Sequence, residues 1–185
     1  MNFVLAILIN VAAGALAGYI NGLLVTLANI PALIATLATQ NILFGLAYII
    51  CGGQSIAGFP DAFRVLGQGY IGPVPIPVIL MVLFFAIGGF ILNRTYFGRS
   101  LYAIGGNEEA AKLSGINVNR VKRLVYMISG LFAGISAVVT LSRVNSGQAN
   151  TGDGFEFDVI TAIVLGGVSV NGGSGRLYNA VIGVL

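Results

Sequence analysis

The sequence predicts an all-α polytopic membrane protein, and three observations lead to this fold class. Hydrophobic residues make up 57% of the 185-residue chain, and the mean hydropathy is +0.95, so the chain carries more apolar surface than it could bury from water. Charged residues make up only 8%, against about a quarter in a soluble domain. The apolar residues gather in runs long enough to cross a bilayer. We therefore expect one membrane domain over residues 1–185, with four full transmembrane helices, a broken or re-entrant segment and the start of another helix.

Composition also excludes several function classes. The chain has no histidine, the commonest metal ligand and general base, and its one cysteine, Cys51, allows no internal disulfide. The net charge of +3 does not indicate a nucleic-acid partner, because the basic residues cluster beside apolar spans, where they set topology. The acidic group Asp153, Glu156 and Asp158 has the spacing of no recognised metal site. We expect no catalytic residue, no metal site and no bound cofactor, and the lipid bilayer is the expected surrounding.

The first span covers residues 3–27, which at about 1.5 Å per residue is long enough to cross the hydrocarbon core. Gly14, Gly18 and Gly22 recur at every fourth position, so they share one face and allow a neighbouring backbone to approach closely. Ordinary helix packing is favoured over a special dimer motif as the reason for this spacing.

The second span, residues 32–50, carries two amides at its centre, Gln40 and Asn41. An amide that faces lipid is costly, so both side chains are expected to face protein or a water-filled path. An interhelical hydrogen bond and a place in the lining of a translocation path are both compatible with this position.

The third and fourth spans, residues 75–92 and 124–141, flank a polar loop over 94–123, and a further loop over 52–72 precedes the third span. Six of the nine basic residues lie in the 94–123 loop: Arg94, Arg99, Lys112, Arg120, Lys122 and Arg123. Each neighbouring loop has one, Arg64 or Arg143. The positive-inside rule therefore predicts that the 94–123 loop is cytoplasmic.

This loop contains the pattern of a short helix capped at both ends. Asn107 can accept from the first N–H groups, Glu108 and Glu109 complement the positive end of the helix dipole, Lys112 complements the negative end, and Gly115 supplies a left-handed stop. A helix of about two turns is not stable alone in water, so we expect it to dock on something.

The segment over residues 159–176 has an apolar part of only about twelve residues, which is too few to cross a membrane as one helix. Its apolar part ends near Val170 and is followed by a glycine-rich stretch, while Asp158 is expected at the helix N-terminus. A re-entrant or broken helix that lines a translocation path with Gly166 and Gly167 is one interpretation. A short surface helix followed by a glycine loop is the other. Another apolar helix begins at Leu177.

Three separated motifs resemble one family. They are GRSLYAIGGNEEAAKLSGINV over residues 98–118, ANTGDGFEFD over 149–158 and VLGGVSVNGGSGR over 164–176. They occur in the order, and with the intervening spans, of ribose-type sugar permeases of ATP-binding-cassette importers. Members of that family have further helices on both sides of the corresponding region, so the resemblance implies that the chain is part of a longer permease.

The resemblance also implies partners and a site. The coupling helix that contacts a separate ATPase subunit would comprise Asn107, Glu108, Glu109, Ala110, Ala111, Lys112, Leu113, Gly115 and Ile116. ATP would bind the partner, an extracytoplasmic sugar-binding protein would deliver a monosaccharide such as ribose, and a second permease copy would complete the path. The location would be the bacterial cytoplasmic membrane. The identity of the sugar, and whether the two ATPase domains are fused, stay open.

Two other function classes are compatible with parts of the chain. A secondary transporter or channel for a small polar solute could use the 159–176 segment, although ion coupling usually needs an ionisable residue in the membrane and the four spans contain no acidic or basic residue. A membrane scaffold could hold its basic loop on anionic lipid. That interpretation leaves the doubly capped helix unexplained.

Overall fold

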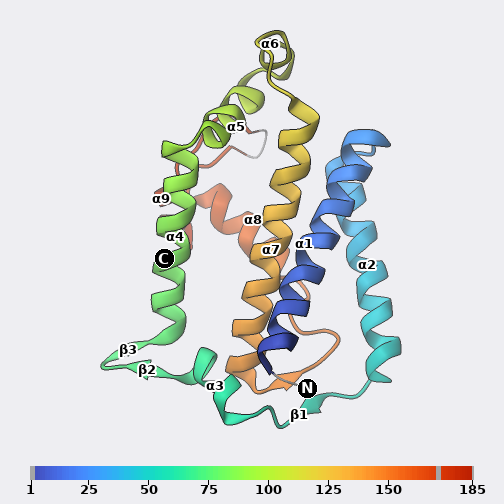
Figure 1. The fold of residues 1–185 in the computed structure, drawn as a ribbon, viewed down its shortest axis with the longest axis vertical. Coiled ribbons are helices and arrows are strands. Elements are labelled where there is room, and N and C mark those ends of the chain that lie inside the picture. Colours follow the sequence, from blue (N-terminus) through green and yellow to red (C-terminus); the bar gives the residue numbers. More distant parts are fainter. Residues whose placement is uncertain (1–2, 170–171, 185) are drawn as a thin grey trace. The chain divides into compact units, whose positions relative to one another are not determined.

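The computed structural model describes residues 3–169 and 172–184 and confirms the all-α fold class (Figure 1). Val170 and Asn171, which belong to the predicted broken segment, lie outside the described residues. The helices in the described part are α1 (Phe3–Leu27), α2 (Ala32–Cys51), α3 (Asp61–Gln68), α4 (Ile76–Arg94), α5 (Tyr96–Gly106), α6 (Glu108–Leu113), α7 (Val118–Val144), α8 (Phe155–Leu165) and α9 (Leu177–Val184). Four of these helices, α1, α2, α4 and α7, are long and apolar enough to cross a membrane.

The chain forms two compact units. The first comprises Met1–Leu80 with Lys122–Thr151, and the second comprises Met81–Val121 with Gly152–Leu185.

Exposed apolar side chains are common on the long helices. Examples are Leu8, Ile50 and Phe90, with 61%, 81% and 65% of their surface exposed. Such exposure would be costly in water and suits helices that face lipid.

In the first unit, α1 and α7 run side by side and meet through glycines (Figure 1). A Cβ on Gly18 would overlap the carbonyl oxygen of Tyr126, and a Cβ on Gly14 would lie 3.2 Å from the Cα of Gly134. Gly130 of α7 has the reciprocal position, because a Cβ there would lie 3.0 Å from the Cα of Gly18. The glycine spacing of α1 therefore serves packing within the chain, which confirms ordinary helix packing as its role.

Polar side chains add bonds between the helices of this unit. The Asn10 side-chain amide donates to the carbonyl oxygen of Gly134 at 2.8 Å, which joins α1 to α7. The Thr39 hydroxyl donates to Asn21 Oδ1 at 2.7 Å, which joins α2 to α1. Such bonds satisfy polar groups where water is excluded.

The predicted loop over residues 52–72 contains more structure than expected. It holds the helix α3 and the strands β1 (Ile56–Ala57) and β2 (Tyr70–Ile71). β1 pairs antiparallel with β4 (Ser146–Gly147), and β2 pairs with β3 (Val74–Pro75). The connection between α2 and α4 therefore contains regular secondary structure that the sequence did not indicate.

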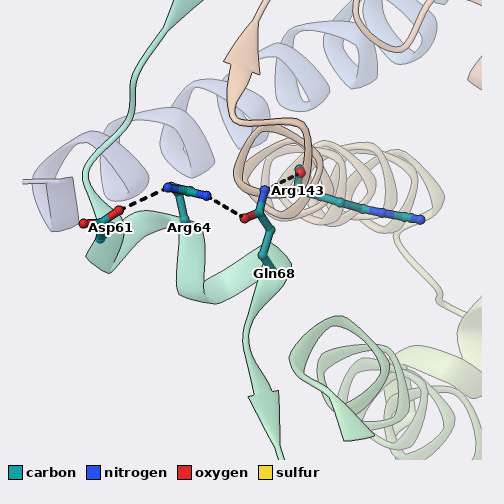
Figure 2. A network of polar contacts seen from close by, with 4 residues as sticks. All are labelled: Asp61, Arg64, Gln68 and Arg143. Carbon is teal, nitrogen blue, oxygen red and sulfur yellow. Dashed lines mark hydrogen bonds and ion pairs between the residues drawn. The ribbon is translucent and has the colours of Figure 1, made fainter.

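Contacts with the end of α7 explain why α3 forms. Figure 2 shows Arg64 between Asp61 and Gln68, with Nη1 3.2 Å from Asp61 Oδ1 and Nη2 3.2 Å from Gln68 Oε1. Gln68 Nε2 in turn donates to the backbone carbonyl of Arg143 at 2.9 Å. The buried side of α3 carries Phe63. An eight-residue helix is marginal alone, so these contacts stabilise it.

In the second unit, a tight turn joins α4 to α5. Thr95 caps α5 by accepting from the N–H of Gly98 at 3.2 Å, and it also donates to the carbonyl of Ile91 at 2.6 Å. A Cβ on Gly98 would overlap the carbonyl of Leu92, so only glycine allows this turn. Much of the polar loop predicted over residues 94–123 is thus helical, because α5 and α6 lie within it.

The helix α8 begins earlier than expected. Gly154, with φ 87°, precedes it, and Phe155 is its first residue. Asp158 lies in the first turn of α8 together with Glu156, so the prediction that it stands at the N-terminal end of this helix is confirmed. Both carboxylates still lie near the positive end of the helix dipole.

Candidate functional site

The first candidate site is α6, whose start is capped by Asn107. The Asn107 backbone is extended, with φ −157° and ψ 106°, and its Oδ1 accepts from the N–H of Ala110 at 2.9 Å. Its carbonyl accepts from the N–H of Ala111 at 3.0 Å. The predicted N-cap is confirmed, and it satisfies backbone donors that a helix start leaves free.

The other end of α6 also closes as predicted. Gly115 has φ 83°, and the N–H of Ile116 donates to the carbonyl of Ala111 at 3.1 Å. Lys112 Nζ lies 3.0 Å from Glu108 Oε1. Both side chains of this ion pair are partly exposed, so it adds only a few tenths of a kcal/mol. The stop at Gly115 lets a helix of only six residues end cleanly.

The two faces of α6 differ sharply. Ala111 is buried, with 3% of its surface exposed, whereas Leu113 is 90% exposed. Glu109 and Lys112 are also exposed. A large apolar side chain at the end of a polar, capped helix leaves apolar surface that a partner protein can bury.

The second candidate site is an open cleft in the first unit, with a volume of about 610 Å³. Residues of α1, α2 and α7 and of the segment after β4 line it. Its polar lining consists of hydroxyl and amide groups: Asn21, Thr36, Thr39, Gln40, Ser129 and Thr151. Phe44 and Tyr126 supply aromatic rings. Among the described residues that line the cleft, none is Asp, Glu, Lys or Arg.

The predicted path residues have different places. Gln40 is half-buried and lines the cleft. Its neighbour Asn41 is exposed, is not in the lining, and donates to the carbonyl of Leu37 in its own helix at 2.9 Å. Gly166 and Gly167 belong to the second unit, at the end of α8, where the backbone of Gly166 packs against Asn179.

Sequence reasoning missed most of the polar lining of the cleft. Thr36, Thr39 and Gln40 are three and four residues apart, so they share one face of α2. That spacing is visible in the sequence. Asn21 and Ser129 line the same cleft because of the way α1 and α7 pack against each other, and the sequence does not show that packing.

Acidic side chains form no evident metal centre. Within residues 3–169 and 172–184, no group of three or more His, Cys, Asp or Glu side chains could hold a metal ion. The functional candidates are therefore a protein-docking helix and an uncharged polar cleft.

Apolar helices of membrane-crossing length around an uncharged cleft place the chain in the class of polytopic α-helical membrane proteins. Comparison with known protein families identifies a particular family within this class. The family described as "Branched-chain amino acid transport system / permease component" matches residues 1–185. The chain belongs to this permease family.

Curated relatives agree with the resemblance seen in the three motifs. The chain is 45% identical over 167 residues to the ribose import permease protein RbsC of Bacillus subtilis (strain 168), covering 89% of this chain and 52% of that protein. It is 45% identical over 166 residues to the L-arabinose transport system permease protein AraH of Escherichia coli (strain K12), covering 90% and 51%. It is 40% identical over 173 residues to the autoinducer 2 import system permease protein LsrC of Klebsiella pneumoniae, covering 93% and 50%.

The chain spans about half the length of these curated relatives. No solved structure matches it.

Proposed function

We propose that this chain is part of the transmembrane subunit of an ATP-driven importer that carries a monosaccharide across the bacterial cytoplasmic membrane. The observation that carries the proposal is α6: a permease-family chain presents a short helix, capped at both ends, with an exposed Leu113. Two relatives are named as permeases for ribose import and for L-arabinose transport, and these names support a sugar as the transported solute.

The lining of the cleft supports a neutral polyhydroxy solute. An amino acid carries a carboxylate and an ammonium group, and each would need an opposite charge or several strong hydrogen bonds when it leaves water. The described lining offers amide and hydroxyl groups instead, which can both donate to and accept from sugar hydroxyls. A monosaccharide therefore suits this cleft better than a branched-chain amino acid, the solute that the family description names.

The coupling helix in this proposal comprises α6 and its caps, from Asn107 to Ile116. Leu113 inserts into a groove of a separate ATPase subunit, and Glu108, Glu109 and Lys112 form the polar rim of the contact. ATP binds to that partner and not to this chain. Closure of two ATPase subunits around ATP displaces α6, which biases the permease between two conformations.

Topology and the other partners follow the same proposal. In this proposal the 94–123 loop is cytoplasmic, which its six basic residues support through the positive-inside rule. An extracytoplasmic sugar-binding protein delivers the solute, and a second permease copy completes the path. In this proposal the short helix α8, whose eleven residues are too few to cross the membrane, belongs to a re-entrant segment.

The test is uptake by the full-length permease reconstituted in liposomes with its candidate ATPase and binding protein. Labelled ribose, arabinose and leucine are compared with and without ATP. The proposal expects uptake of at least one sugar that requires ATP and the binding protein. Sugar flux that is independent of ATP would instead support a secondary transporter or channel, and ATP-driven uptake of leucine alone would contradict the choice of substrate.

A further inference from the structure

Two glycines bring the end of α5 against the loop between α8 and α9. A Cβ on Gly105 would lie 2.7 Å from the Cα of Gly173, and a Cβ on Gly173 would lie 2.6 Å from the carbonyl carbon of Gly105. Neither position has room for a side chain, so the two backbones touch directly. Gly173 also has φ 75°, which favours glycine.

A side-chain bond supports the same contact one turn earlier in α5. The Tyr102 hydroxyl donates to the carbonyl of Gly175 at 3.1 Å. Gly175 also lies close to Val168, because a Cβ on it would lie 3.2 Å from the Val168 Cβ. Residues 172–175 of the loop are thus held between α5 on one side and Val168 on the other.

The loop continues into a tightly packed helix pair. A Cβ on Gly166, directly after α8, would lie 2.7 Å from the carbonyl carbon of Asn179 in α9. A Cβ on Gly183 in α9 would lie 2.8 Å from the carbonyl carbon of Ala162 in α8. Because the two backbones are in direct contact at both glycines, α8 and α9 form one closely packed pair that we expect to shift together.

At the other end, α5 leads directly into α6. Asn107 ends α5 by donating its N–H to the carbonyl of Ala103 at 3.1 Å, and the same residue caps the start of α6. With one residue shared between the two helices, a displacement of α6 reaches Gly105 without an intervening flexible loop.

We propose that the Gly105–Gly173 contact transmits the displacement of α6 to the α8–α9 helix pair, which makes both glycines positioning residues for import. This inference rests on the proposed function, since it takes the ATPase to be what moves α6. Separating the two backbones breaks this connection but leaves the docking surface around Leu113 in place.

The chain offers a matched pair of variants. Gly105→Ala puts a methyl group against the backbone of Gly173, whereas a Cβ on its neighbour Gly106 meets nothing within 4 Å. Both glycines lie in the last turn of α5, so both substitutions change helix propensity in the same direction. Gly106→Ala is therefore the control. Tyr102→Phe, which removes only the bond to Gly175, is the milder test.

The experiment follows α8 in the full-length permease bound to its candidate ATPase in lipid nanodiscs. A nitroxide is attached at Leu165→Cys, a position that is 74% exposed at the end of α8, with Cys51→Ser removing the native cysteine of this region. The accessibility of the nitroxide to a relaxation agent is measured before and after ATP is trapped with vanadate. Co-purification of the ATPase and sugar uptake are measured on the same preparations.

The parent and Gly106→Ala are expected to show a change in accessibility when ATP is trapped. Gly105→Ala is expected to keep the ATPase but to lose both this change and uptake, and Tyr102→Phe to reduce the change by about threefold, the value of one modest hydrogen bond. An unaltered response in Gly105→Ala or Tyr102→Phe, or a parent that binds the ATPase without any response at α8, overturns the inference. A parent that binds no ATPase contradicts the proposed function itself.

Discussion

The hydroxyl of Ser142, near the end of α7, accepts a hydrogen bond from the backbone N–H of Gly67 in α3 at 2.7 Å. It also donates to the carbonyl of Phe63 at 2.6 Å. Phe63 and Gly67 are four residues apart, the separation that an α-helical hydrogen bond joins, so the hydroxyl bridges one turn of α3. Ser142 has no exposed surface, and it therefore joins two segments that are far apart in the sequence.

Ser142→Ala is expected to lower the free energy of unfolding by about 1–3 kcal/mol, because it leaves the buried Gly67 N–H without this acceptor. Thermal unfolding of the full-length permease in detergent measures the effect. Ser100→Ala is the matched control, since Ser100 is 2% exposed and its hydroxyl donates to the carbonyl of Tyr96 in its own helix. Equal melting temperatures for the two variants would show that the hydrogen bonds from Ser142 to α3 do not add to the stability of the protein.

Gly18→Ala is expected to destabilise the α1–α7 packing by roughly 1–3 kcal/mol, the usual cost of overpacking, because its Cβ would overlap the carbonyl of Tyr126. Gly45→Ala in α2 is the control, because a Cβ there meets nothing within 4 Å. It should be neutral or slightly stabilising, since alanine favours a helix. Thermal stability by size-exclusion chromatography measures both variants. A Gly18→Ala protein as stable as the parent would refute this packing.

Gln40→Leu is expected to reduce sugar uptake by about fivefold, because it replaces an amide in the polar lining of the cleft with an apolar group. The neighbouring Asn41→Leu should transport as the parent does, since Asn41 is exposed and bonds to its own helix. Initial rates of ATP-driven uptake, normalised to permease in the membrane, make the comparison. Equal loss in both variants would mean that the cleft is not part of the path.

Leu113→Ala is expected to weaken binding of the ATPase by roughly tenfold, since burying a leucine contributes about 1.5–3 kcal/mol. Binding of the purified ATPase to the full-length permease in nanodiscs measures the affinity. Ser114→Ala changes the next exposed residue, which bonds to the carbonyl of Ala110, and should bind normally. A normal affinity for Leu113→Ala would remove this side chain from the interface.

The capped helix α6 could be predicted from the residues near its two ends. The caps of α6 depend on residues within a few positions of one another, so Asn107 and Gly115 could be assigned from spacing alone. The membrane class followed from hydropathy for the same reason, since each long helix contains an apolar stretch long enough to cross a membrane.

Long-range contacts account for what the sequence did not predict. The helix α3 is short and depends on Ser142 and Arg143, which lie far along the chain. Its local signals were Asp61 in the first turn and an Arg64 spaced to pair with it. Likewise, the four-residue spacing of Gly14, Gly18 and Gly22 indicated close helix packing. It did not identify α7 as the helix that packs there, because that depends on the fold.

Co-purification of the full-length permease with its candidate ATPase, using two proline variants at matched membrane expression, tests the central claim most directly. Ala111→Pro removes the N–H that bonds Asn107 and costs about 3 kcal/mol in a helix interior. Glu108→Pro falls at the first helical position, after an extended Asn107, where proline is tolerated. The account predicts that Ala111→Pro loses the ATPase and Glu108→Pro keeps it. Retention of the ATPase by both variants, or no association in the parent, would contradict it.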